Sequence, residues 1–199
     1  MELFILFIRI LFVVITFVYS YHFILALVKM KQRIILPTSE KELAMIRKYP
    51  EKMIHAPTYT KQKNGIIMYA LFLSYMIIMF ILGSYFLDFY WTLYLLFILP
   101  VFHLSNLLNM FAFTQDGVLC GARFVPWKKI KSFEFVRIDI NHRYYGFSKE
   151  VNDQYELKIK TRSGTFSCIV TSNEMKERLR FFLDQQKIAE LHLEKDILY

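Results

Sequence analysis

A long run without charged residues is the feature that most constrains this chain. Residues 66–87 contain no Asp, Glu, Lys or Arg, and at about 1.5 Å rise per residue a helix of this length spans roughly 30 Å of hydrocarbon. Two other runs are similar: residues 3–28, interrupted by Arg9 and His22, and residues 89–113, which have no acidic or basic charge. The pattern predicts three transmembrane helices, at about 3–28, 66–87 and 89–113.

The first run fits a membrane helix better than a cleaved signal peptide. A basic cluster at Lys29, Lys31 and Arg33 follows the apolar stretch instead of preceding it, and no small-residue cleavage site is present. Arg9 lies about one and a half turns from the outer end, where a long side chain reaches the headgroups. A functional charge inside the membrane is the alternative for Arg9.

Charge distribution predicts the orientation of the chain. The loop at 29–65 carries nine Lys or Arg against three Glu, whereas the opposite side has only Glu2 and Asp88 outside the apolar cores. By the positive-inside rule this loop is cytoplasmic, the N-terminus is outside and everything after residue 113 is inside. The formal net charge of +8 is therefore concentrated beside the membrane, and nucleic acid is an improbable partner.

The basic loop contains one predicted helix, at residues 40–49. Ser39 and Glu42 have capping-box spacing, and Pro50 ends the segment. Leu43, Ile46 and Tyr49 would share one face. That face would lie either on the anionic inner leaflet or on the C-terminal domain, and the sequence leaves both open.

Residues 114–199 change to short alternating strands with turn signals, which predicts an antiparallel sheet with one buried face. A C-terminal helix should cap the sheet, with Thr171 and Glu174 as its capping box. The predicted fold class is thus three membrane helices (1–113) plus an α+β cytoplasmic domain (114–199). The predicted strands are 118–120, 123–126, 131–139, 155–161 and 165–171.

One motif carries a family resemblance. The run from Asp116-Gly117 through Pro126-Trp127-Lys128-Lys129-Ile130 resembles the bacterial pleckstrin-homology-like (PH-like) families, in which a glycine turn and a strand precede a Pro-Trp-x-x-Ile segment. The chain is similar, more narrowly, to small Gram-positive membrane proteins of unknown function that carry such a domain after their helices. The resemblance covers about residues 114–187 and implies a PH-like sheet capped by the helix. It implies no phosphoinositide site, because no basic cluster matches a lipid-binding pattern.

The sequence shows no catalytic or metal-binding constellation. Phosphate loops, nucleophile elbows and zinc-helix motifs are absent, and Cys120 and Cys168 have no metal-ligand spacing. We therefore expect no cofactor and no enzymatic activity. A membrane enzyme is the third-ranked reading, since the inner ends of the predicted helices carry no carboxylate.

Two groups of residues are candidate contacts for a partner or lipid. His103, Asn106 and Asn109 form a polar stripe on the third predicted helix, which contacts either a substrate or a neighbouring helix. A loop rich in aromatic and basic residues follows the predicted strand at 131–139. The candidates there and in the family motif are Arg143, Tyr144, Tyr145 and Trp127.

These features favour a non-enzymatic, multi-pass protein of a bacterial cell membrane. Its cytoplasmic domain would bind a protein partner or the inner leaflet, as an accessory, regulatory or immunity-type factor. The alternative is a subunit of a transport or lipid-handling complex built on the polar stripe and on Pro100 in the same helix. Three helices make a thin wall for a conduit, so transport would require homo-oligomers or a larger partner.

Overall fold

The computed structural model describes residues 2–85, 104 and 107–191, and these fall into two compact units. The helical unit comprises Met1–Gln32, Pro57–Asn109 and the short piece Gly121–Phe124. The β unit comprises Arg33–Ala56, Met110–Cys120 and Val125–Tyr199. Residues 33–56 therefore belong with the later strands, which the sequence did not indicate.

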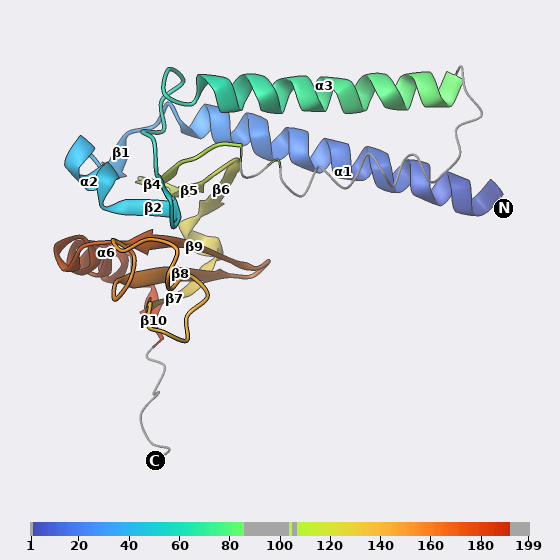
Figure 1. Cartoon of the computed structure of the whole chain (residues 1–199). Helices are drawn as coiled ribbons and strands as arrows, with labels where there is room; N and C mark the ends of the chain where they lie inside the picture. Colours follow the sequence, from blue (N-terminus) through green and yellow to red (C-terminus); the bar gives the residue numbers. More distant parts are fainter. Residues whose placement is uncertain (1, 86–103, 105–106, 192–199) are drawn as a thin grey trace, which may run out of the picture. The chain divides into compact units, whose positions relative to one another are not determined.

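Two long apolar helices, α1 (Glu2–Lys29) and α3 (Lys63–Tyr85), lie side by side in the helical unit (Figure 1). Stacked rings join them at two levels. Phe23 stacks on Tyr69 with ring centroids 4.2 Å apart, and Phe12 stacks on Phe80 at 5.7 Å. Because residue numbers rise along α1 as they fall along α3, the two helices are antiparallel.

Most of the surface of α1 and α3 faces away from the protein. Only 11% of the most apolar window of α1 and 17% of that of α3 is buried, and both helices are long and apolar enough to cross a membrane. The third predicted helix, at 89–113, lies mostly outside the described residues. Its predicted end was wrong, because Phe111–Thr114 forms strand β4.

The start of α3 packs closely against the segment that precedes β4. A Cβ atom added at Gly65 would lie 2.5 Å from the carbonyl oxygen of Leu107, which no side chain tolerates against backbone. The Gln62 side chain donates a hydrogen bond from Nε2 to the carbonyl oxygen of Asn109, at 3.1 Å. This close approach explains the glycine in the first turn of α3.

The β unit contains two sheets. A four-stranded sheet has the order β1-β4-β5-β6, and a six-stranded sheet has the order β10-β7-β8-β9-β2-β3. The pairs β1–β4, β4–β5, β2–β3, β2–β9, β7–β8 and β8–β9 are antiparallel, and β10 runs parallel to β7. The strands are β1 (Ile34–Leu36), β2 (Ile46–Tyr49), β3 (Lys52–Met53), β5 (Gly117–Cys120), β6 (Arg123–Pro126), β7 (Ile130–Arg137), β8 (Tyr155–Thr161), β9 (Thr165–Val170) and β10 (Ala189–Glu190). A 3-10 turn, η1 (Trp127–Lys129), joins β6 to β7.

The predicted helix at 40–49 is only half correct. The Ser39 hydroxyl accepts the amide of Glu42 as the capping box requires, but α2 ends after Glu40–Ala44 and strand β2 begins at Ile46. Residues 46–49 form a strand because they pair with β9, where Ile46 lies opposite Val170 and is fully buried. Leu43 packs against the core of the β unit, so this segment lies on the domain.

The C-terminal helix α6 (Asn173–Gln185) covers one face of the six-stranded sheet. Met175, Leu179 and Leu183 are buried against this face, and their spacing places them on one side of the helix. The predicted cap was wrong: Ser172 precedes the helix, and the Thr171 hydroxyl donates to the carbonyl oxygen of Met45 instead. The long apolar helices, the mainly antiparallel strands and the C-terminal helix agree with the predicted α+β class.

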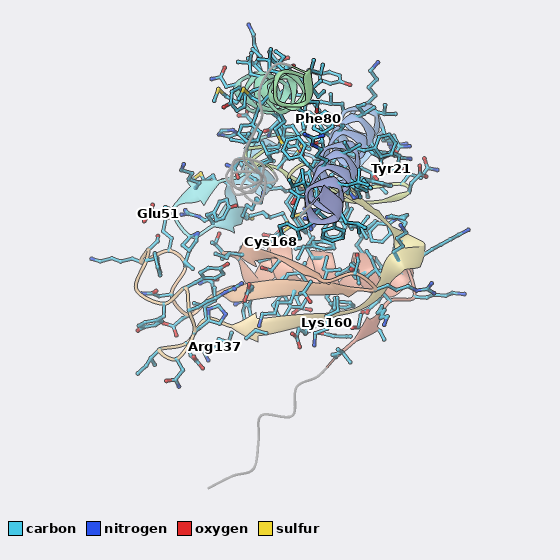
Figure 2. All side chains as sticks on the ribbon, turned by 90° about the vertical axis from the view of Figure 1, so that its right-hand side faces the viewer. Tyr21, Glu51, Phe80, Arg137, Lys160 and Cys168 are labelled. Atoms are coloured by element: carbon cyan, nitrogen blue, oxygen red, sulfur yellow. The ribbon has the colours of Figure 1, made fainter. Side chains whose placement is uncertain are left out.

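Part of the opposite face of the six-stranded sheet is also buried, so the prediction of a single buried face was wrong. The β7–β8 loop, residues 138–154, supplies Ile138 and Val151, which pack on Ile169 of β9. We call this side the loop face and the other the α6 face. Figure 2 shows Arg137 and Lys160 near opposite ends of the β7–β8 pair that both faces share.

Candidate functional site

A buried carboxylate organises the loop face. Glu156 of β8 is 0% exposed, because it lies between Val136 and Ile169 in the register and beneath the β7–β8 loop. The Ser167 hydroxyl donates to Oε1 at 2.6 Å, and Arg143 donates to the same oxygen at 2.7 Å. The alternating pattern of β8 predicts that Glu156 faces solvent, but its charge is buried inside the domain.

The second oxygen of Glu156 also receives a hydrogen bond. Nδ1 of His142 accepts the backbone amide of Tyr144, so the ring proton lies on Nε2 and is donated to Oε2, 3.0 Å away. Lys158 adds a positive charge 3.7 Å from Oε2. Ser167 and Lys158 come from the two central strands, whereas His142 and Arg143 come from the loop and tie it to the sheet.

The electrostatics favour the charged form of this carboxylate. Burial alone would raise the pKa of Glu156, but the hydrogen bonds from Ser167 and Arg143 and the charges of Arg143 and Lys158 hold it below its ordinary value. Charge-assisted hydrogen bonds of this kind are the strong ones in proteins. The site is thus a structural anchor that is fully formed at neutral pH.

Two of the candidate contact residues belong to this anchor. Arg143 pairs with Glu156 and lies over the ring of Tyr144, with its guanidinium 4.5 Å from the ring centroid. Tyr144 is half-buried against the small cluster of Ile138, Val151 and Ile169, and burial raises the pKa of its hydroxyl. The aromatic and basic composition of the loop therefore reflects, in part, its attachment to the sheet.

Other side chains of the same loop point away from the domain. Ile140 is 75% exposed, Tyr145 41% and Phe147 59%. Between them, the amide of Gly146, whose positive φ suits glycine, donates to the Asn152 side chain at 2.9 Å. An anchored loop thus presents an apolar triad, Ile140, Tyr145 and Phe147, to the surroundings.

A second ion pair holds the far end of the loop. Arg47 of β2 is buried, pairs with Glu150 and also donates to the carbonyl oxygen of Pro50 at 2.9 Å. The loop is therefore attached at both ends, to β8 through Glu156 and to β2 through Arg47. Ordered attachment lowers the entropy lost when exposed side chains bind a partner.

The remaining candidates lie elsewhere. Trp127 is half-buried, with its ring stacked on Phe113 and its Nε1 donating to the carbonyl oxygen of Gln115 at 3.0 Å. His103 and Asn106 lie outside the described residues. Asn109 is described, and its backbone carbonyl receives the Gln62 hydrogen bond in the helical unit.

No metal site is evident within the described residues 2–85, 104 and 107–191. No three His, Cys, Asp or Glu side chains in that part of the chain are grouped to hold a metal ion. Cys168 is buried in the core, and burial raises the pKa of its thiol well above the ordinary value. This environment suits a packing residue and not a reactive thiol.

Comparison with known proteins adds no assignment. No protein-family model, curated protein or solved structure matches the chain. The functional argument consequently depends on the geometry of the site alone.

The sequence pattern did not single out three residues that define the site: Glu156, Ile140 and Phe147. Alternation places Glu156 on the same side as Lys158 and Lys160, which indicates an exposed face. Ile140 stands alone in a polar loop, and Phe147 is one of several aromatic residues in the same segment, so neither has a distinct sequence signal. A loop long enough to fold back over its own strands was the available signal for a buried partner on that face.

Proposed function

We propose that this chain is a non-enzymatic integral membrane protein whose β unit is a cytoplasmic recognition module that binds a protein partner. The observation that carries the proposal is the apolar triad on the β7–β8 loop, held outward by the buried Glu156 anchor. Exposed apolar residues on a rigid loop are typical of a contact surface. The proposed role is that of an accessory, regulatory or immunity-type factor in a bacterial membrane.

The exposed surfaces of α1 and α3 support the membrane assignment. Side chains such as Phe17 and Leu71, 71% and 60% exposed, would each cost on the order of 1–2 kcal/mol in water, and lipid removes this cost. The charge asymmetry of the sequence favours the β unit on the cytoplasmic side. A third membrane helix before β4 and a PH-like relationship of the sheet and α6 remain part of the proposal.

Co-purification in mild detergent tests the proposal. Full-length chain is compared with a triple variant, Ile140→Ser, Tyr145→Ser and Phe147→Ser, which leaves the Glu156 anchor intact. Phe181→Ser is the matched control, because Phe181 is 66% exposed on α6, away from the loop. The proposal predicts a protein that is retained by the native chain and the control and lost by the triple variant.

Two results would contradict the proposal. One is a clean preparation with no bound protein from either the native chain or the control. The other is loop amides that are protected from hydrogen exchange by anionic lipid nanodiscs but not by neutral ones, which would assign the loop to the inner leaflet.

A further inference from the structure

The outer edge of β7 is only partly paired. Leu191, just after β10, donates its amide to the carbonyl oxygen of Phe133 at 2.8 Å. Along a strand, the backbone N–H and C=O groups of successive residues point alternately to the two neighbouring strands. The backbone groups of Phe135 and Arg137 therefore point to the same outer edge as those of Phe133, away from β8. Within the described part of the chain, no strand covers that edge beyond Leu191.

A hollow of about 360 Å³ lies along this free edge. One wall comes from α6, through Lys176 and Arg180, and the other from the β7–β8 loop, through Asp139, Asn141 and His142. The base is β7 itself, from Glu134 to Arg137, and Figure 2 shows Arg137 at this end of the strand. An unpaired edge between two walls has the form of a slot for one more extended strand.

Two charged side chains, Glu134 and Lys176, lie beside the edge. Within the described residues, neither has a hydrogen bond to a group of opposite charge. On the loop face, Glu134 is 4% exposed, and its Oε2 has no hydrogen-bond partner within the described residues. Its Oε1 lies 3.6 Å from Lys160 Nζ, which is an ion pair and not a hydrogen bond. A buried carboxylate oxygen left in this state costs free energy that a bound donor would recover.

On the α6 face, Lys176 makes no ion pair within the described residues. Its ammonium lies 3.8 Å from the centroid of the Tyr155 ring and 5.9 Å from that of Phe135. Arg180, one turn further along α6, is already paired with Glu190 of β10 at 2.9 Å. The slot therefore has a carboxylate, Glu134, on the loop-face side of its base and an ammonium, Lys176, in its α6 wall.

We propose that the free edge of β7 binds an extended segment of the partner protein as an added strand, with a basic side chain facing Glu134 and an acidic side chain facing Lys176. Strand addition supplies main-chain hydrogen bonds at Phe135 and Arg137, and alternate side chains supply the specificity. A residue opposite Val136 lies diagonal to Glu134, within reach of a lysine or arginine. This inference rests on the proposed function and names the site and the chemistry of that partner.

The probe is a capped seven-residue peptide of threonine and valine with an adjacent lysine and glutamate at its centre. Adjacent residues of a strand face opposite sides, so the two charges meet opposite walls. Binding to the full chain in lipid nanodiscs is measured by peptide fluorescence and by hydrogen exchange of β7. A peptide with methionine in place of the lysine is the control ligand.

Two protein variants isolate the interactions. Arg137→Pro removes an amide that faces the edge but none that pairs with β8, and Arg137→Thr is its matched control. We expect Arg137→Pro to abolish binding and Arg137→Thr to bind like the native chain. Glu134→Gln should weaken binding of the lysine peptide about tenfold and leave the methionine peptide unchanged.

The inference fails if the lysine peptide does not bind at millimolar concentration, or if Arg137→Pro binds it normally. It also fails if the amides of Phe135 and Arg137 are protected from hydrogen exchange without peptide and lose this protection when residues 192–199 are removed. The C-terminal residues of the chain itself would then occupy the edge of β7. If no peptide binds at the β7 edge but the triple loop variant still loses its co-purified protein, the proposed function stands and only this binding site is rejected.

Discussion

Replacing Glu156 with glutamine removes the charge that anchors the β7–β8 loop and keeps the shape of the side chain. The amide oxygen can still accept from Ser167, so that hydrogen bond survives. The Arg143 side chain is 63% exposed, so water can replace its interaction with Glu156, and the variant loses at most about 1 kcal/mol of folding free energy there. His142 is 9% exposed, and losing its charged acceptor costs about 1 kcal/mol more, which gives an expected loss near 2 kcal/mol.

Cys168 is an internal reporter for this loss. Cys168 is 1% exposed in β9, beside Ser167, so we expect its thiol to react only when the sheet opens. With Cys120 replaced by alanine in both proteins, labelling by a dipyridyl disulfide should be about 30-fold faster in Glu156→Gln than in the parent at neutral pH. Equal rates would refute the conclusion that Glu156 is a stabilising anchor.

The pH dependence of the same rates tests the sign of the electrostatic argument. The pKa of Glu156 is lowered in the folded protein, so its stabilisation is complete above the ordinary value of 4.5 and is lost as pH falls through the folded pKa. The difference between parent and variant should therefore be constant near neutrality and shrink in acid. A difference that grows as pH falls would contradict the assignment.

Two further substitutions test the packing of each unit. Gly65→Ala places a Cβ against the Leu107 carbonyl oxygen and should lower the thermal midpoint of the full chain in detergent, with a loss of about 1–3 kcal/mol; an unchanged midpoint would contradict the close approach. Arg178→Gln removes the 2.5 Å ion pair with Glu42, which links α6 to α2, and should cost about 1 kcal/mol in the Cys168 labelling assay. Burial would raise the pKa of Glu42, but hydrogen bonds from Thr38 and the charge of Arg178 lower it overall, so the cost should disappear in acid; a cost that persists there would refute this.

The sequence was most informative where a pattern extends over many residues. The apolar runs predicted α1 and α3, and alternation over Tyr155–Thr161 predicted β8 at its observed bounds. Residues 46–49 were misread because a good capping box precedes them and only pairing with β9, more than a hundred residues later, makes them a strand. Local signals cannot report such a partner.

The candidate site was predictable only in outline. Composition drew attention to the aromatic and basic loop, but it could not separate the inward Arg143 and Tyr144 from the outward Tyr145. That division depends on Glu156, whose burial follows from the loop folding over the sheet. The edge of β7 is free because β10 pairs only with its first half, at Ser132 and Phe133. This could not be predicted, because nothing in the sequence of residues 189–190 indicates a strand.

The central claim is that α1 and α3 hold the β unit on the cytoplasmic side of a membrane, and site-directed thiol labelling tests it most directly. Single cysteines are introduced as Glu2→Cys at the N-terminus and Lys149→Cys in the exposed β7–β8 loop, and intact cells are treated with a membrane-impermeant maleimide. The parent chain, with Cys168 buried and Cys120 partly buried, gives the background. The account predicts that Glu2→Cys is labelled in intact cells and Lys149→Cys only after permeabilisation; labelling of Lys149→Cys in intact cells would contradict it.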